Sequence, residues 1–151
     1  MRLTAFTDFG FRILMRLAGA PTQSFTTEEI ATEFQISRNH LAKVVHDLSK
    51  AGYIKTRRGA GGGFRLVSPP QSITLGDVVR SLEQRHALVD CFRSDGGSCV
   101  LTPHCLLRSR LAAAREAFLR ELDMTTLAQC VYPATPQPAV SPRAAACPAP
   151  H

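Results

Sequence analysis

The chain has 151 residues, which is enough for one domain with its own hydrophobic core, or for one domain and a tail. The net charge is +6, and residues 1–66 carry ten Lys/Arg against five Asp/Glu, whereas residues 67–132 carry seven of each. Positive charge confined to one segment favours a nucleic-acid partner over ordinary surface basicity. The N-terminus has no signal-peptide pattern, and no stretch approaches the roughly 18 continuous apolar residues of a membrane span. We therefore expect a cytoplasmic protein that does not bind a membrane.

Three helices are predicted in the N-terminal part of the chain. Residues 7–19 have apolar side chains at helical spacing, and a glycine and a proline end the segment. A second helix begins at the pair Thr26 and Glu29, which has the spacing of a capping box. A third helix follows a short turn, with Ser37 as its N-cap, and runs to about Ala51. Consecutive helices of this kind are typical of a helix–turn–helix.

The third predicted helix has an apolar face and an opposite polar face. The apolar residues recur at helical spacing and are aimed at the core: Leu41, Val44, Val45 and Leu48. The polar face consists of Asn39, Lys43, His46 and Lys50, with Arg38 and His40 beside it at the N-terminal end. A recognition helix presents such side chains to base edges and phosphates, and a merely solvated helix face is the alternative. On the first interpretation, the helix contributes these DNA-binding residues: Ser37, Arg38, Asn39, His40 and Lys43.

A β-hairpin with a glycine-rich loop is predicted after this helix. Residues 53–56 and 64–67 have the pattern of short strands, and the loop between them contains two arginines and four glycines. Glycine lets the backbone take positive φ and approach a duplex, while arginine meets phosphate or the minor groove. A nucleotide-binding loop does not fit, because no Lys-Ser/Thr pair follows and the loop leads into a strand. The candidate DNA-binding residues of this wing are Arg57, Arg58, Gly59, Gly61 and Gly62.

The predicted fold class is mainly α-helical with a small β wing. A winged helix–turn–helix domain occupies residues 1–82, and its last element is a short helix from Leu75 to about Leu82, capped by Thr74 and Asp77. Such a domain is a device for holding DNA. Because the chain shows no arrangement of a nucleophile with a base, we do not expect an enzyme.

A polar loop, residues 83–105, leads to a long C-terminal helix. Thr102 is the expected N-cap of this helix and Pro103 its first residue. A heptad-like apolar stripe runs along residues 106–132 and consists of Leu107, Leu111, Ala114, Phe118 and Leu122. A small domain has few other surfaces to bury such a stripe, so we expect a dimerisation helix; packing onto the chain's own winged domain is the alternative. Residues 133–151 contain six prolines and are expected to form a disordered tail.

Three cysteines lie close together between the winged domain and the long helix. Seven residues separate Cys91 from Cys99 and five separate Cys99 from Cys105, whereas Cys130 and Cys147 do not share this spacing. Clustered thiols in a cytoplasmic chain more often bind metal or do redox work than form structural disulfides. Thiolates are the usual ligands of Fe–S clusters, and Cys105 is expected as the third helical residue, where the positive helix end favours an anionic cluster. A zinc site with one further ligand and a redox disulfide switch are the alternatives.

Several separate motifs occur in the same order in a known family of regulators. They cover roughly residues 1–132 and are Leu3–Gly10, Ser37–Leu41, Leu48–Tyr53, Arg57–Gly63, Ile73–Val79, the three cysteines and Phe118–Asp123. With these motifs the chain resembles the NsrR family of nitric-oxide-sensing transcriptional repressors. It resembles the related IscR family less closely, because the histidine that IscR proteins use as a cluster ligand is replaced here by Arg108.

The resemblance implies a homodimer that binds double-stranded operator DNA. It also implies one Fe–S cluster per subunit, with 4Fe–4S favoured over 2Fe–2S, held by Cys91, Cys99 and Cys105 and by Asp8 of the partner subunit. The interval between Cys91 and Cys99 is longer than is usual in the family, but no donor is lost. Nitric oxide is the implied signal, since it attacks an accessible iron and dismantles the cluster. The alternative interpretation, from the residues alone, is that Asp8 is an acid that favours the start of a helix.

Two other functions are compatible with the same sequence. An Fe–S or redox-sensing regulator of cluster biogenesis, similar to IscR, would use the same fold and the same cysteines. A zinc-stabilised or cofactor-free DNA-binding module would have no sensing role. The colour of the purified protein separates these classes, because an Fe–S protein is brown and a zinc protein is colourless.

Overall fold

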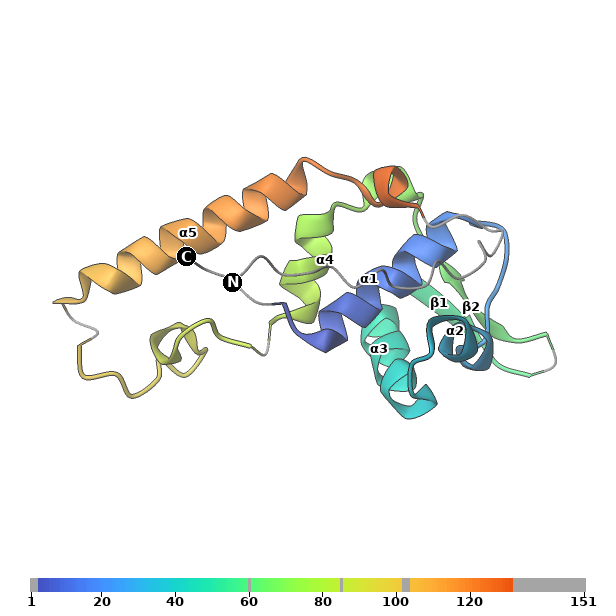
Figure 1. Cartoon of the computed structure of the whole chain (residues 1–151), viewed down its shortest axis with the longest axis horizontal. Coiled ribbons are helices and arrows are strands. Elements are labelled where there is room, and N and C mark those ends of the chain that lie inside the picture. Colours follow the sequence, from blue (N-terminus) through green and yellow to red (C-terminus); the bar gives the residue numbers. More distant parts are fainter. Residues whose placement is uncertain (1–2, 60, 85, 102–103, 132–151) are drawn as a thin grey trace, which may run out of the picture.

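Helices and a small antiparallel sheet follow each other in the order that the sequence predicts (Figure 1). The computed structural model describes residues 3–59, 61–84, 86–101 and 104–131. The helices and strands are α1 (Ala5–Ala18), α2 (Thr27–Phe34), α3 (Arg38–Lys50), β1 (Ile54–Arg57), β2 (Gly63–Leu66), α4 (Leu75–Leu82) and α5 (Leu106–Asp123). Short 3-10 turns lie at Pro70–Ser72, Asp90–Phe92 and Leu127–Cys130. Within the described ranges, no helix is long and apolar enough to cross a membrane.

The helix starts follow from side chains that accept backbone hydrogen bonds. Thr26 and Glu29 form the predicted capping box: Thr26 Oγ1 accepts from Glu29 N at 3.2 Å, and Glu29 Oε2 accepts from Thr26 N at 2.7 Å. The bond from the Thr26 backbone lowers the pKa of Glu29. Thr74 Oγ1 accepts from Asp77 N at 3.1 Å and caps α4, as predicted. Ser37 occupies the N-cap position of α3, but its side chain makes no capping hydrogen bond.

Helices α1, α2 and α3 pack around a common core together with the wing sheet (Figure 1). The residues predicted for the core face of α3 are buried, and Leu41, Val44 and Leu48 have 0% exposed surface. Ile13 and Leu14 of α1 belong to the same buried cluster. The burial of such apolar side chains away from water is the largest favourable contribution to the stability of a domain of this kind. Burial therefore fixes the orientation of α3 and leaves its opposite face to solvent.

The wing strands lie one residue away from their predicted positions. Tyr53 N donates to Leu48 O in the turn that follows α3, so β1 begins at residue 54 and not at residue 53. Strand β2 begins at residue 63, because Gly63 pairs with Arg57 at the end of the ladder. The shift places Arg57 at the end of a strand, whereas the sequence predicts it in the loop.

The loop after α4 and the long helix α5 project from the winged domain as an arm (Figure 1). The C-terminal end of α5 docks on α4, where Leu119 is buried and Arg80 donates two hydrogen bonds to Asp123, at 2.7 and 2.6 Å. These bonds lower the pKa of the Asp123 carboxyl. The two helices approach so closely that a side chain at Gly76 would collide with Asp123. The arm is thus anchored to the winged domain at one end.

Helix α5 does not begin where the sequence predicts. Cys105 is its N-cap, with an extended backbone (φ −83°, ψ 104°), and Leu106 is its first residue. The prediction that Cys105 is the third helical residue is therefore wrong, because an extended backbone at this position cannot continue a helix from before it. The expected N-cap Thr102 and the expected first residue Pro103 lie outside the described residues, as does the predicted tail, residues 133–151.

The apolar stripe of α5 has an open end and a packed end. Leu107 is 64% exposed and its neighbour Leu106 is 71% exposed. Ala114 is also exposed, and the remaining stripe residues are half-buried: Leu111, Phe118 and Leu122. Within the described part of the chain, the C-terminal half of the helix packs on α4, whereas the N-terminal half is left largely uncovered.

Candidate nucleic-acid interface and metal centre

The polar face of α3 is open to solvent along its N-terminal half. All the residues that the sequence predicts as DNA contacts from this helix are exposed: Ser37, Arg38, Asn39, His40 and Lys43. The burial of the apolar face fixes the rotation of the helix about its axis, so these side chains remain on the surface. Polar and basic groups at the N-terminal end of an exposed helix can hydrogen-bond base edges and phosphates.

Arg38 is paired with an acidic side chain of the neighbouring helix. Its Nη1 lies 3.2 Å from Glu28 Oε2, and the two side chains are 72% and 65% exposed. An ion pair as exposed as this contributes little to stability. Arg38 can therefore exchange Glu28 for a phosphate, and Glu28 places a negative charge beside the candidate DNA surface.

The glycines of the wing loop hold it in a defined turn. Gly62 N donates to Gly59 O at 2.8 Å, and a Cβ at Gly62 would lie only 2.5 Å from Arg57 O. Gly59 and Gly61 have φ values of 92° and 71°, which favour glycine. Arg57 and Arg58 flank this turn and are exposed. The predicted wing residues therefore lie together on one hairpin, whose first strand packs next to α3.

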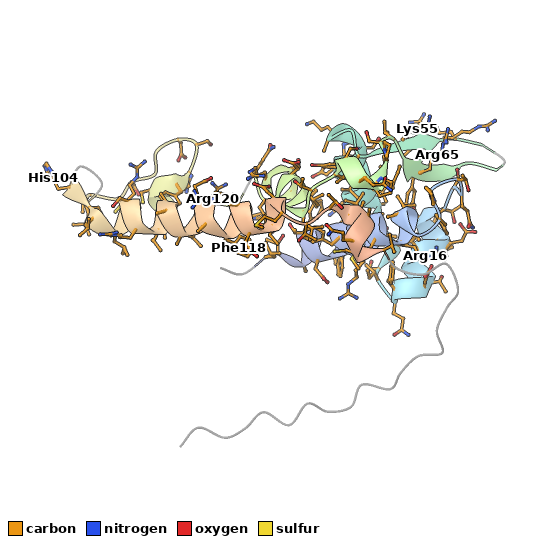
Figure 2. The ribbon with its side chains drawn as sticks, turned by 90° about the horizontal axis from the view of Figure 1, so that it is seen from above. Arg16, Lys55, Arg65, His104, Phe118 and Arg120 are labelled. Atoms are coloured by element: carbon orange, nitrogen blue, oxygen red, sulfur yellow. The ribbon has the colours of Figure 1, made fainter. Side chains whose placement is uncertain are left out.

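Two basic residues of the wing are missing from the sequence-based set of DNA contacts. Lys55 and Arg65 stand directly opposite each other in the β1–β2 ladder, and both are exposed (Figure 2). The sequence pattern that could have identified them is the alternation of apolar and basic side chains along the two strands. Their apolar neighbours point to the inner face and are buried: Ile54, Phe64 and Leu66. Their pairing also requires the strand register, which the structure supplies.

The three clustered cysteines lie on the arm, and all three are half-buried. Cys91 lies in the 3-10 turn after α4, Cys99 in the loop that follows, and Cys105 at the start of α5. Among the described residues, neither these cysteines nor Cys130 form a disulfide. Cys147 lies outside the described residues.

The loop between Cys91 and Cys99 folds back on itself. Asp90 Oδ2 accepts from Ser98 N at 2.8 Å, and a side chain at Gly97 would collide with Asp90. Asp90 and Ser98 directly precede the two cysteines in the chain. Their hydrogen bond therefore brings the backbone around the two cysteines together, despite the long interval in the sequence.

The cysteines are suitable metal ligands in kind but do not converge within this chain. Cys91 and Cys105 line a broad hollow between the loop and α5, together with His104 and Arg108. Over residues 3–59, 61–84, 86–101 and 104–131, however, no three His, Cys, Asp or Glu side chains stand close enough together to hold a metal ion. A three-thiolate site would therefore require the loop to change its conformation.

Asp8, the predicted fourth ligand, is paired within its own chain. It lies in the first turn of α1, with Oδ2 2.8 Å from Arg12 Nη2, and both side chains are about half exposed. In the described part of this chain, Asp8 belongs to no group of potential metal ligands. Its predicted role therefore depends on a second subunit.

Glu83 connects the start of the cysteine loop to the N-terminal end of α1. Its Oε1 accepts from Thr4 N and from Thr4 Oγ1, both at 2.8 Å, and from Thr7 Oγ1. Thr7 is completely buried. Burial alone would raise the pKa of Glu83, but the hydrogen bonds from Thr7 and Thr4 outweigh it and lower the pKa. A charged carboxylate thus ties the loop to the helix that carries Asp8.

Comparison with known proteins relates the chain to a family of regulators. The Rrf2 family, described as an iron-dependent transcriptional regulator, matches residues 3–133. The HTH-type transcriptional regulator NsrR of Geobacillus kaustophilus (strain HTA426) is 47% identical over 129 residues, which are 85% of this chain and 88% of that protein.

Solved structures of regulators share the fold. CymR of B. subtilis, the global cysteine regulator, has a TM-score of 0.65 and 29% identity, over 84% of this chain and 93% of its own. IscR of T. potens has a TM-score of 0.66 at 24% identity, over 85% of this chain and 84% of its own. These structures confirm the predicted fold class, which is mainly helical with a small two-stranded wing.

Proposed function

The chain belongs to the Rrf2 family of transcriptional regulators, and on this basis we propose that it is a nitric-oxide-responsive repressor. As a cytoplasmic homodimer it binds operator DNA while an Fe–S cluster is intact, and it releases the DNA when the cluster is lost. The proposal rests on three features that occur together in one chain. The polar face of α3 is exposed, a glycine-rich wing lies beside it, and three cysteines lie on the adjoining arm. The similarity to the NsrR of G. kaustophilus supports the choice of signal. A regulator of this kind has no need of a catalytic site.

The proposed DNA contacts divide between α3 and the wing. The exposed residues at the N-terminal end of α3 face base edges and phosphates: Ser37, Arg38, Asn39, His40 and Lys43. Arg57 and Arg58 of the wing meet the backbone or the minor groove. The glycines between the strands allow the loop to approach the duplex closely. If a dimer neutralises about six phosphates, the logarithm of its affinity should fall with the logarithm of salt concentration with a slope near −5.

Cys91, Cys99 and Cys105 are the proposed thiolate ligands, and Asp8 of the partner subunit is the proposed fourth ligand. A cluster held by these residues, of the 4Fe–4S type by preference, would supply an iron with a weakly bound oxygen ligand, which would be accessible to nitric oxide. The ion pair between Asp8 and Arg12 involves Oδ2 of the carboxylate and is about half exposed, so it is weak enough not to prevent Asp8 from binding a metal. Cys130 and Cys147 take no part in this site.

The arm links the proposed metal centre to both elements that set the DNA-binding geometry. The cysteine loop begins at Glu83, which is bound to α1, and ends at α5, the proposed dimerisation helix. A conformational change at the cysteines therefore acts on the winged domain and on the dimer contact together. The half-sites of a dimeric reader lie about one helical turn apart, roughly 34 Å, so a small shift prevents simultaneous docking of both recognition helices.

Anaerobic purification with iron and sulfide analysis tests the metal centre. We expect a brown protein that binds operator DNA and releases it after exposure to nitric oxide. Cys91→Ser, Cys99→Ser and Cys105→Ser should each lose most of the iron, whereas Cys130→Ser is the matched control and should keep it. A colourless protein that contains zinc would support a zinc-stabilised module, and full iron content in Cys99→Ser would contradict the ligand assignment.

Asp8→Ala distinguishes a cluster ligand from a residue that only favours the start of α1. If Asp8 is a ligand, the variant dimer stays folded, but its absorption spectrum and its rate of reaction with nitric oxide change. Arg12→Ala is the matched control, because it removes the same ion pair and leaves the carboxylate in place. Identical spectra and rates in Asp8→Ala and the unmodified protein would assign Asp8 to the helix start alone.

A further inference from the structure

The outer face of the wing sheet carries a group of positive charges. Lys55 stands opposite Arg65 in the β1–β2 ladder, and Arg57 lies two residues further along β1, on the same face. All three side chains are exposed. Figure 2 shows Lys55 and Arg65 next to each other on the wing. This face is distinct from the glycine-rich turn at the tip of the hairpin.

Among the described residues, no carboxylate forms an ion pair with these charges. Residues 48–76 contain five Lys/Arg and no Asp or Glu. Within the described part of the chain, neither Lys55 nor Arg65 takes part in an ion pair, whereas Arg12, Arg38 and Arg80 each have a carboxylate partner. Like charges directly opposite each other weaken a sheet. The stability of the wing therefore does not explain why Lys55 and Arg65 lie opposite each other. A negatively charged binding partner would explain it.

We propose that Lys55 and Arg65 together form a clamp for one phosphate of the DNA backbone. The inference rests on the proposed DNA binding and adds to it a contact that is separate from those of the wing tip. The Cβ atoms of directly opposite residues are about 5 Å apart, so both charged groups can reach the same phosphate. Arg65 offers parallel N–H donors to two phosphate oxygens, and Lys55 adds a mobile point charge.

The position of the clamp also suits this role. The wing follows α3 directly, so a duplex that is engaged by the recognition face and by the hairpin tip passes close to the hairpin. Phosphate contacts of this kind set the register of a protein on DNA without reading its sequence.

The clamp makes a quantitative prediction for the salt dependence of binding. Each neutralised phosphate contributes about −0.9 to the slope of log affinity against log salt, so two wings contribute about −1.8. At 0.15 M salt, the loss of one such contact lowers affinity about five-fold, and the loss of two lowers it about thirty-fold. Lys55→Gln combined with Arg65→Gln removes both charges and preserves much of the length of the side chains.

The test compares this double variant with a control of equal net charge. Arg110→Gln combined with Arg120→Gln is the control, because both arginines are exposed on α5, away from the wing and outside the apolar stripe of the proposed dimer contact (Figure 2 labels Arg120). The control applies once size-exclusion chromatography shows the same oligomeric state as the unmodified protein. The probe is a random-sequence duplex of about 30 base pairs, since contacts to phosphate do not depend on sequence. We expect an approximately thirty-fold loss of affinity and a slope reduced by about 2 for the wing variant, with a control within about two-fold of the unmodified protein.

Thermal unfolding separates the clamp from a structural role of the same residues. Removing two opposed like charges should leave the unfolding midpoint of the wing variant unchanged or higher. A lower midpoint would overturn the clamp, because it would show that the two side chains support the hairpin. Arg65→Glu is a second variant: its carboxylate faces Lys55, so it should raise the midpoint and weaken DNA binding more than Arg65→Gln does.

The outcomes also distinguish the clamp from the proposed function. If the unmodified protein shows no salt-dependent affinity for the duplex, the proposed DNA binding fails. If the unmodified protein binds and the wing variant binds with the same affinity and slope, DNA binding stands and the clamp is overturned.

Discussion

Replacing Glu83 by glutamine keeps the shape of the side chain and removes its negative charge. In the folded chain, one carboxylate oxygen accepts hydrogen bonds from Thr4 N, Thr4 Oγ1 and Thr7 Oγ1. The amide oxygen of glutamine can accept the same bonds, but they are then bonds between neutral groups. We therefore expect Glu83→Gln to weaken the hydrogen bonds between α1 and the start of the cysteine loop without breaking them.

The expected size follows from the strength of charged hydrogen bonds. A hydrogen bond to a charged group contributes about 1.5–3 kcal/mol to stability and is roughly twice as strong as a neutral one. The three donors share a single oxygen and Glu83 is only partly buried, so their contributions do not add fully. We expect the free energy of unfolding to fall by about 1 kcal/mol, which for a chain of this size corresponds to about 2–4 °C in the unfolding midpoint.

The pH dependence has a defined sign. Because the pKa of Glu83 is lowered in the folded chain, the carboxylate stabilises the fold above its unfolded pKa, near 4.3, and this contribution is lost as pH falls through the folded pKa. The difference between Glu83→Gln and the unmodified protein should therefore be full at pH 7 and should shrink below about pH 4.

Urea unfolding at pH 7 and at pH 3.5 measures this difference. Glu116→Gln is the control, because the ion pair of Glu116 with Arg115 is exposed and the substitution should change stability by less than about 0.5 kcal/mol. Equal unfolding midpoints for Glu83→Gln and the unmodified protein at pH 7 would refute the reasoning. So would a difference of the same size at both pH values.

Two further predictions concern DNA affinity and assembly. Glu28→Gln should raise DNA affinity a few-fold and leave stability within about 0.5 kcal/mol, because it removes an exposed negative charge beside Arg38. Weaker binding in fluorescence anisotropy would instead mean that Glu28 orients Arg38 for DNA. Leu107→Glu should yield monomers in size-exclusion chromatography with light scattering and retain its helical circular dichroism, since Leu107 is 64% exposed in the single chain. A persistent dimer would argue against a role of the N-terminal half of α5 in dimerisation.

The parts of the fold that were predictable depend on residues close together in the sequence. The capping box of Thr26 and Glu29 and the buried face of α3 each follow from side chains three to seven positions apart, and both are confirmed. The start of α5 was not predictable in this way. Thr102 and Pro103 have the residue types of a helix start, but Cys105 adopts an extended backbone and caps the helix without a side-chain hydrogen bond.

The contacts that organise the candidate site join residues far apart in the sequence. Glu83 and Thr4 are 79 positions apart, and no local pattern relates them. The pairing of Lys55 with Arg65 requires the strand register, and a shift of one residue changes every pair and the face on which each side chain lies. The proposed role of Asp8 requires a second subunit, which a pattern within one chain does not describe.

On the proposed function, α1 is the element through which the arm acts on α3, the proposed recognition helix. Its N-terminal end is bound to Glu83 at the start of the cysteine loop. One turn later, α1 lies so close to α4 that a side chain at Gly10 would collide with Leu82, and the Cβ of that side chain would lie 3.8 Å from Val44 Cγ1 of α3. Val44 is completely buried, so α3 and α1 share one close-packed core, and a displacement of α1 is transmitted to α3 by direct contact. On the proposed function, a rearrangement of the cysteine loop around Glu83 therefore displaces α1, and α1 displaces α3 because the two helices are packed together. This coupling requires no separate hinge.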